Sequence, residues 1–386
     1  MHQGTQLGFC EMGFRLIRIL KTLQWIMIAL LMITVLTKDM GINKNIGFNV
    51  KRKMAKSYSP EITSTASTAS STSPTSSTTP IPTVAYTKNM YLEFSGRFGN
   101  VIFEITAAYG MLLEAHYNKM YFIDNQTQGI QAGRFTRVFP KFRNLVNVVT
   151  KFPPNLVVVK ELGPNKFHRK TVEEMKAATK DVHFGKYLGV PSYWWPKYKK
   201  EIKEMLAVSE ELQNKVRNYL FKIASRQNVS LAARKDTLKS GISPKLSGDV
   251  PVLVGVHSRR GDKIAFYQYQ GWVAPEKAYF QKAMDYYRSK FKRVYFIVVS
   301  QHKDWGKQNI VGKDVIHSDA AEDIVEFGLL TLCDHFILSL GSFGWWAGFL
   351  TGGEVVYFPG HVKPNSTAST FYNSTQYFLP HWKPMR

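Results

Sequence analysis

The fold of this chain is decided by the stretch Val252-Leu253-Val254-Gly255-Val256-His257-Ser258-Arg259-Arg260-Gly261-Asp262. Its first five residues are apolar or glycine and predict a buried strand, which opens directly into a loop with two adjacent arginines. In an open α/β sheet, ligands bind beyond the carboxyl ends of the strands. Arginine there is a fixed positive fork that suits phosphate oxygens. The stretch therefore favours an anion site; a strand end followed by a solvated basic turn is the alternative.

After this strand, helical and strand patterns alternate to the end of the chain. Helices are predicted over Pro275–Phe291, Ala321–Leu332 and Trp345–Leu350. Strands are predicted over Val294–Val299, Val315–His317, Phe336–Leu340 and Glu354–Phe358. This alternation is typical of a parallel, doubly wound sheet, so the fold class is α/β.

The first half of the body shows a similar but sparser pattern. Short strands are predicted over Tyr91–Phe94, Lys119–Ile123 and Leu156–Val159, and helices over the segment after Asn100 and over Glu201–Ile223. The glycine-bearing loop before the first helix favours a βαβ unit whose helix N-terminus receives an anion. Composition turns polar over Asn228–Asp249. We therefore expect two lobes, residues 86–245 and 246–386.

The first 85 residues do not look globular. Residues 22–37 are an uncharged 16-residue stretch flanked by basic residues, which favours an uncleaved signal anchor after a cytoplasmic tail, residues 1–21. A cleaved signal peptide is the alternative. Residues 38–85 are the predicted stem, because 14 of the 18 residues from Thr63 to Pro80 are Ser or Thr. Such a segment cannot bury enough apolar surface to fold.

Four sequons suggest that the body faces a secretory lumen, although single sequons are weak signals. They are centred on Asn125, Asn228, Asn365 and Asn373. The cysteines do not contribute, because Cys10 precedes the anchor and Cys333 has no partner within the body. Cys333 lies in an apolar run, which favours a buried thiol over a nucleophile.

The formal charge of +23 suggests an anionic partner. The predicted anchor and sequons place the body away from nucleic acid, and no nucleic-acid motif is present. A phosphorylated small molecule or a membrane surface fits better. No Asp-x-Asp and no His/Cys/Asp cluster with metal-ligand spacing occurs in the sequence. We therefore expect no metal cofactor, with arginine and backbone N–H groups neutralising a phosphate.

The candidate site residues lie at strand ends and helix starts. Arg259 and Arg260 are the candidate cations, and the Gly341–Gly344 turn is a second phosphate cradle in which Ser342 adds a hydroxyl or simply caps the helix. A carboxylate at Glu326 suits the ring N–H and amino group of guanine; an exposed helix glutamate is the alternative. His257 contacts a ligand or is structural. The tryptophans that follow the turn, Trp345 and Trp346, are expected in the core.

Several segments together resemble the α-1,2-fucosyltransferase family and, more distantly, the α-1,6- and protein O-fucosyltransferases. They are Gly96-Arg97-Phe98-Gly99-Asn100, His257 to Asp262, Val299-Ser300 with Trp305, Glu326-Phe327-Gly328-Leu329-Leu330, Cys333-Asp334-His335, and Ser342-Phe343-Gly344-Trp345-Trp346-Ala347 to Leu350-Thr351-Gly352-Gly353. Their order and spacing match the family.

The resemblance implies a type II Golgi membrane protein with a lumenal GT-B body, two Rossmann-like lobes with the donor in the cleft. Its reaction would be metal-independent, inverting transfer of fucose from GDP-fucose, typically to the 2-hydroxyl of terminal galactose on glycoproteins or glycolipids. Oligomeric state is left open.

The resemblance also implies roles for individual residues. Arg259 would hold the β-phosphate, and His257 would contact the nucleotide. Arg260 and Asp262 would brace the loop. The donor would also meet Glu326, Ser342 and Phe343, and the sugar or acceptor would meet Arg97 and Asn100. The related families often have Asp at the Glu326 position. Asp262 and Glu104 are the candidate general bases, and the aromatic run Tyr193-Trp194-Trp195 either stacks on acceptor sugar or packs in the interior.

Three alternatives stay open at this point. One is a fucosyltransferase with another acceptor or linkage, including protein O-fucosylation. The second is a catalytically silent glycan-binding protein of the same fold. The third and weakest is display of the adhesion tripeptide Arg260-Gly261-Asp262, which a buried Arg260 would exclude.

Overall fold

A computed structural model describes residues 87–93, 96–123, 133–159, 169–184, 195–234, 238, 250–260, 264–370 and 372–386. These residues all belong to one compact unit, Pro80–Arg386. The predicted tail, anchor and stem lie outside the described residues. Within the described ranges, no helix has both the length and the apolar character that a membrane crossing requires.

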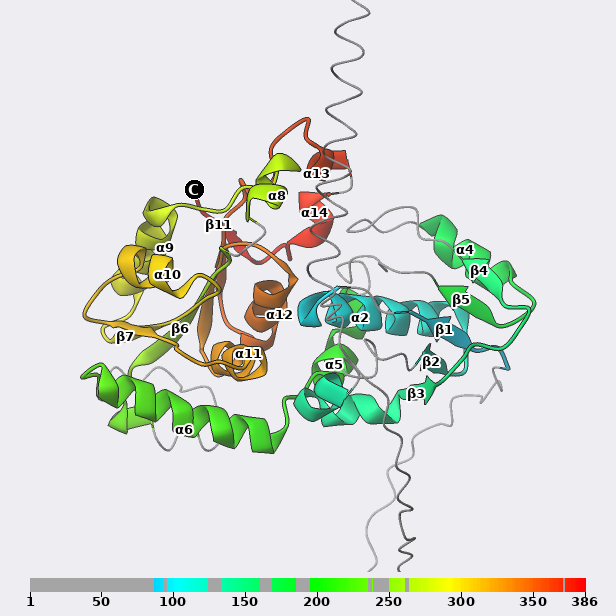
Figure 1. Cartoon of the computed structure of the whole chain (residues 1–386), viewed down its shortest axis with the longest axis horizontal. Helices are drawn as coiled ribbons and strands as arrows, with labels where there is room; N and C mark the ends of the chain where they lie inside the picture. The colour runs from blue at the N-terminus through cyan, green and yellow to red at the C-terminus, as the bar shows by residue number, and fades with distance from the viewer. Residues whose placement is uncertain are drawn as a thin grey trace, which may run out of the picture. The chain divides into compact units, whose positions relative to one another are not determined.

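The first lobe is built on a five-stranded parallel sheet with the order β3-β2-β1-β5-β4 (Figure 1). Its strands are β1 Met90–Leu92, β2 Met120–Ile123, β3 Val146–Val149, β4 Val157–Val159 and β5 Val182–Phe184. Its helices include α2 Phe98–Ala115, η1 Pro140–Asn144, α4 Arg169–Ala177 and α5 Trp195–Met205. Helix α2 follows β1 directly, as the sequence predicts for a βαβ unit.

The second lobe is built on a six-stranded parallel sheet with the order β11-β10-β9-β6-β7-β8. Its strands are β6 Val252–Ser258, β7 Val294–Ser300, β8 Val315–His317, β9 His335–Leu338, β10 Val355–Tyr357 and β11 Lys383–Pro384. Its described helices are α8 Ile264–Tyr269, α9 Lys277–Lys290, α10 Lys303–Asn309, α11 Asp323–Thr331, α12 Ser342–Thr351, α13 Thr367–Thr370 and α14 Ser374–Tyr377. Two preceding elements are α6 Glu210–Arg226, which packs against this lobe, and a short η3 at Ala232–Arg234. The predicted α/β class with a parallel sheet is confirmed in both lobes.

Strand β6 is central because it is apolar on both faces. All seven of its residues are buried. Val252, Val254 and Val256 pack in the cluster that contains α9, while Leu253 packs in the larger cluster that contains α11 and α12. Successive strand residues point to opposite faces, so a continuous apolar run is required where helices cover both sides of a parallel sheet.

The prediction of a single helix over Glu201–Ile223 is wrong. The structure has two helices there, because α5 ends at Met205 and α6 begins at Glu210. The Ser209 side chain accepts a hydrogen bond from the Leu212 backbone N–H at 3.3 Å and caps α6, whose first turn carries Glu210 and Glu211. A serine followed by acidic residues is a helix-start signal that was available in the sequence. Helix α6 packs against α11 of the second lobe. The predicted lobe boundary at 245/246 lies outside the described residues.

The strand order of the second sheet locates its ligand crevice. Counted from β6, the order reverses between β6 and β9, since β6 pairs with β7 on one side and with β9 on the other. In open parallel sheets this switch point, beyond the carboxyl ends of the strands, is where ligands bind. Strand β6 ends at Ser258 and β9 at Leu338, so the residues that follow them form this crevice.

Candidate functional site

Arg259 lies at the switch point, one residue beyond the end of β6. Its backbone N–H donates to the Ser339 hydroxyl oxygen at 3.0 Å, which ties the loop after β6 to the loop after β9. Gly341 has a positive φ of 90°, and a Cβ there would lie 2.8 Å from Cδ of Arg259. Glycine is thus required at 341 both by its conformation and by the close approach of the arginine stem.

The two adjacent arginines have different environments. The Arg260 guanidinium donates to the Pro275 carbonyl at 2.8 Å, pairs with Glu276 at 2.7 Å and stacks 3.9 Å from the Trp305 ring. Its side chain is 14% exposed and held by these three contacts, which disfavours free display of the adhesion tripeptide. Among the described residues, by contrast, no carboxylate forms an ion pair with Arg259. Its hydroxyl partner is Tyr267, at 3.4 Å from Nη2.

The start of α12 faces the same crevice. Gly341 is its N-cap, without a side-chain cap, and its first turn has no acidic residue. The interpretation of Ser342 as a plain N-cap is therefore wrong, because Ser342 is the first helical residue. The first N–H groups of a helix lack intrahelical acceptors and favour anions. This end of α12 and Arg259 together make an anion-binding arrangement.

The start of α2, from the first lobe, meets the start of α12. The Ser342 hydroxyl donates to Oδ1 of Asn100 at 2.5 Å. A Cβ on Gly99 would lie 2.4 Å from the Phe343 backbone nitrogen, so only glycine permits this approach. The Phe98 ring packs edge-on against Phe327, with centroids 5.0 Å apart. Asn100, Ser342 and Phe343, predicted separately, are thus brought together.

His257 is buried beneath the first turn of α12. It is 5% exposed, its ring centroid is 5.5 Å from that of Phe343, and its Nδ1 has no hydrogen-bond partner among the described residues. A Cβ on Gly344 would lie 2.3 Å from Nδ1, so this glycine makes room for the imidazole. Burial, with a further contribution from Arg259, lowers the pKa of His257 to about 3. The imidazole is neutral at physiological pH.

Glu326 lies on α11 and is not an exposed helix glutamate, so that alternative is wrong. Its side chain is 14% exposed and accepts from Lys303 at 2.9 Å. Burial raises the pKa of Glu326, while the hydrogen bond from Lys303 opposes the rise. Lys303 also donates to the Ala320 carbonyl at 2.8 Å, which anchors the ammonium group. The carboxylate is therefore held in a fixed position near the start of α11.

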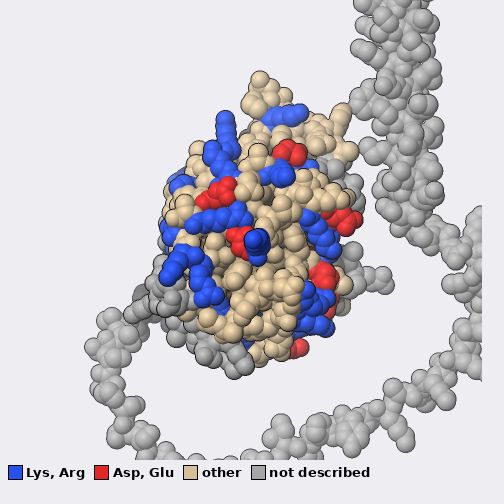
Figure 2. Space-filling view, turned by 90° about the vertical axis from the view of Figure 1, so that its left-hand side faces the viewer, with Lys and Arg blue, Asp and Glu red and all other residues tan. Residues whose placement is uncertain are grey.

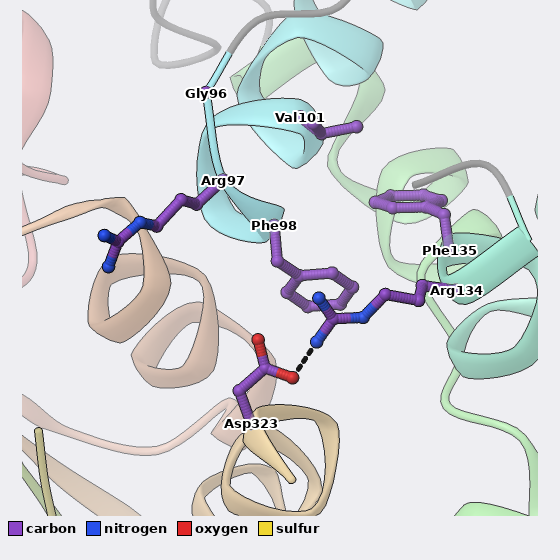
Figure 3. Close-up of a pocket in the computed structure, with 7 residues that line it drawn as sticks. All are labelled: Gly96, Arg97, Phe98, Val101, Arg134, Phe135 and Asp323. Atoms are coloured by element: carbon purple, nitrogen blue, oxygen red, sulfur yellow. Dashed lines mark ion pairs between the residues drawn. The ribbon is translucent and has the colours of Figure 1, made fainter. Parts of the chain in front are cut away.

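A pocket of about 370 Å³ lies beside the start of α2 (Figure 3). It is lined by Gly96, Arg97, Phe98, Val101, Arg134, Phe135 and Asp323. Arg134 of the first lobe forms an ion pair with Asp323 of α11, and Figure 3 shows Arg97 pointing away from that pair. The pocket thus has walls from both lobes and carries two guanidinium groups.

The remaining predicted residues divide into buried, exposed and undescribed groups. Glu104 is 3% exposed inside α2. Trp345, Trp346 and Cys333 are buried as predicted, and burial raises the pKa of the Cys333 thiol. Three sequon asparagines are described: Asn228 and Asn365 are exposed and Asn373 is half-buried. Asp262, Asn125, Tyr193, Trp194 and the side chain of Trp195 lie outside the described part of the chain.

Part of the positive charge lies on one face of the second lobe (Figure 2). Figure 2 shows the side of the second lobe that carries α9 and α10, where Lys and Arg are more frequent than Asp and Glu. Within the described ranges, no group of three or more His, Cys, Asp or Glu is placed to hold a metal ion.

Comparison with known families adds to this geometry. Residues 140–386, more than half of the chain, match the family described as "Glycosyl transferase family 11". The chain belongs to glycosyl transferase family 11. The resemblance to α-1,2-fucosyltransferases is confirmed by this match and by curated relatives. Galactoside alpha-(1,2)-fucosyltransferase 1 from Bos taurus is 35% identical over 146 residues, which is 36% of this chain and 40% of the relative.

A second curated relative and a solved structure are also similar to this chain. The Homo sapiens galactoside alpha-(1,2)-fucosyltransferase 1 is 36% identical over 144 residues, covering 35% of this family 11 chain and 39% of the relative. The match thus spans about two fifths of these curated relatives. Among solved structures, a mutant of Arabidopsis thaliana FUT1 in complex with GDP aligns with 78% of this chain and 76% of that one, at 8% identity and a TM-score of 0.41.

Proposed function

We propose that this protein transfers fucose from GDP-fucose to a glycan, forming an α-1,2 linkage to terminal galactose. The observation that carries the proposal is Arg259, placed at the switch point beside the start of α12 and paired with no described carboxylate. Membership of family 11 and the names of the curated relatives support fucose as the transferred sugar. Two parallel-sheet lobes support a GT-B arrangement with the donor between them.

The chemistry follows from where charge develops. The acceptor hydroxyl oxygen forms a bond to C1 of fucose, while the bond from C1 to the β-phosphate oxygen breaks and its electron pair leaves with GDP. The Arg259 guanidinium and the N–H groups at the start of α12 stabilise the charge on the departing phosphate. They act without a metal ion, and C1 is inverted by single displacement.

The other groups of the site are assigned by their positions. Glu326, held by Lys303, accepts from guanine, and neutral His257 packs beneath the pyrophosphate. Asn100 and Arg97 face the sugar or the acceptor from the first lobe. We assign the proton of the acceptor hydroxyl to Asp262, with Glu104, which is buried in α2, as the second candidate base.

The cellular setting is part of the proposal. The sequence of residues 1–85 supports a single-pass type II Golgi protein whose body, residues 86–386, is lumenal, with an O-glycosylated stem and N-glycans on exposed sequons such as Asn228. Its acceptors are galactose-containing glycans of glycoproteins or glycolipids.

The test is transfer from radiolabelled GDP-fucose by the full-length protein in detergent, on a glycan array that includes galactose-terminated chains. Product on terminal galactose, cleaved by an α-1,2-specific fucosidase, is the expected result, and it should persist in EDTA. Product on other sugars or on protein hydroxyls would indicate another fucosyltransferase. GDP binding without product would indicate a silent glycan-binding protein, and a strict Mn²⁺ requirement would contradict the metal-free mechanism.

A further inference from the structure

Arg259 contacts the side chain of Tyr267, on the short helix α8. The Arg259 guanidinium donates from Nη2 to the Tyr267 hydroxyl oxygen at 3.4 Å, and its Cζ lies 5.5 Å from the centre of the Tyr267 ring. On the other side, the arginine stem passes Gly341 so closely that no Cβ would fit there. The guanidinium is thus held between the loop after β9 and the ring of Tyr267.

The chemical nature of this partner distinguishes Arg259 from other arginines of the lobe. Arg260 pairs with Glu276, Arg234 with Asp334 and Arg288 with Asp314. A carboxylate partner orients a guanidinium but also offsets its charge, which weakens its attraction for another anion. A phenol hydroxyl is neutral at physiological pH and accepts a hydrogen bond without offsetting the charge.

We infer that Tyr267 is a positioning residue for the phosphate-binding arginine, fixing the direction of the Arg259 guanidinium while leaving its positive charge available to the departing diphosphate. This inference rests on the proposed function, because it gives Arg259 an anionic ligand. Tyr267 itself acts through Arg259 and is not assigned a contact with the substrate.

The helix that carries Tyr267 provides a matched control. Tyr269 lies two residues further along α8 and is 84% exposed. Tyr267→Phe keeps the ring over the guanidinium and removes the hydroxyl, whereas Tyr269→Phe removes a hydroxyl from a solvent-exposed side chain. Both substitutions are conservative, so the folded protein can be compared directly with the wild type.

The experiment measures binding of inorganic pyrophosphate by calorimetry on the full-length protein in detergent, together with transfer kinetics. We expect Tyr267→Phe to weaken pyrophosphate binding about fivefold, the size expected when one ordinary hydrogen bond is lost. It should lower kcat while leaving KM for the acceptor unchanged. Tyr267→Glu should weaken pyrophosphate binding more, because a negative charge beside Arg259 would offset the positive charge of its guanidinium. Tyr269→Phe should change neither quantity.

A double-mutant cycle decides whether Tyr267 acts through Arg259. In the Arg259→Lys background the effect of Tyr267→Phe should fall below about twofold, since coupled residues are not additive. The inference is overturned if Tyr267→Phe binds pyrophosphate like the wild type, or if its full effect persists in that background. A protein with the expected pyrophosphate pattern but no fucose transfer would instead overturn the proposed function and keep the role of Tyr267.

Discussion

The hydroxyl of Ser342, the first residue of α12, donates to Oδ1 of Asn100, the third residue of α2, at 2.5 Å. Helix α2 of the first lobe and helix α12 of the second lobe therefore meet through their N-terminal ends. Each of these ends carries N–H groups without intrahelical acceptors, so their convergence concentrates positive potential beside Arg259. This contact brings residues 242 positions apart in the sequence into one site.

Replacing Arg259 by lysine tests the proposed phosphate clamp. Lysine keeps the charge but loses the planar fork of the guanidinium. We therefore expect kcat to fall because the activation free energy rises by about 2–4 kcal/mol. Steady-state kinetics with GDP-fucose measures this, and Arg226→Lys, at a half-exposed ion pair with Asp319, is the control. Near-normal turnover in Arg259→Lys would contradict the clamp.

Replacing Arg260 by lysine should lower the stability of the fold and leave ligand binding nearly unchanged. Its guanidinium stacks on Trp305 and donates to the Pro275 carbonyl, so we expect a loss of about 1–2 kcal/mol of unfolding free energy. Pyrophosphate affinity should stay within about threefold of the wild type. Denaturant unfolding and calorimetry on the same sample separate the two effects; a large loss of affinity with unchanged stability would assign Arg260 to the ligand instead.

Gly99→Ala tests the contact between the two helix starts. The new Cβ would lie 2.4 Å from the backbone nitrogen of Phe343, and a backbone atom cannot yield as a flexible side chain can. We expect the free energy of unfolding to fall by about 1–3 kcal/mol and the rate of fucose transfer to fall as well. The control is Gly133→Ala, where a Cβ meets nothing within 4 Å. Equal thermal stability of the two variants would show that the lobes separate freely at this point.

The stability of the fold should depend on pH through His257. Its folded pKa of about 3 is lower than the ordinary value of 6.5, so the unfolded chain takes up the proton first as pH falls. The stabilisation by neutral His257 is complete above pH 6.5 and is lost progressively between 6.5 and 3.

Between pH 6.5 and 3, the free energy of unfolding should depend less steeply on pH in His257→Gln than in the wild type. The slope should fall by up to about 1.4 kcal/mol per pH unit, which corresponds to one proton. Denaturant unfolding at several pH values measures the slope. An unchanged slope in the variant would mean that His257 takes up its proton over the same pH range in the folded and unfolded chains.

The sequence predicted much of the second lobe because its signals are local. The apolar run of β6 and the periodicity of α9 and α11 each lie within one segment, and the structure places these elements within a few residues of prediction. In the first lobe, β3 and β5 were missed because three or four residues of a strand give little period-two signal. The break before α6 was missed although Ser209 and its acidic neighbours marked it.

The candidate site shows where local signals end. The sequence by itself determined that an arginine pair follows a buried strand and that a glycine turn opens a later helix, because these depend on residues adjacent in the chain. Only the tertiary structure decided which arginine is left without a described carboxylate partner. Glu276, Trp305 and Tyr267 reach the pair through folding of separate elements. Such pairings depend on distances in space, and no pattern along the chain encodes them.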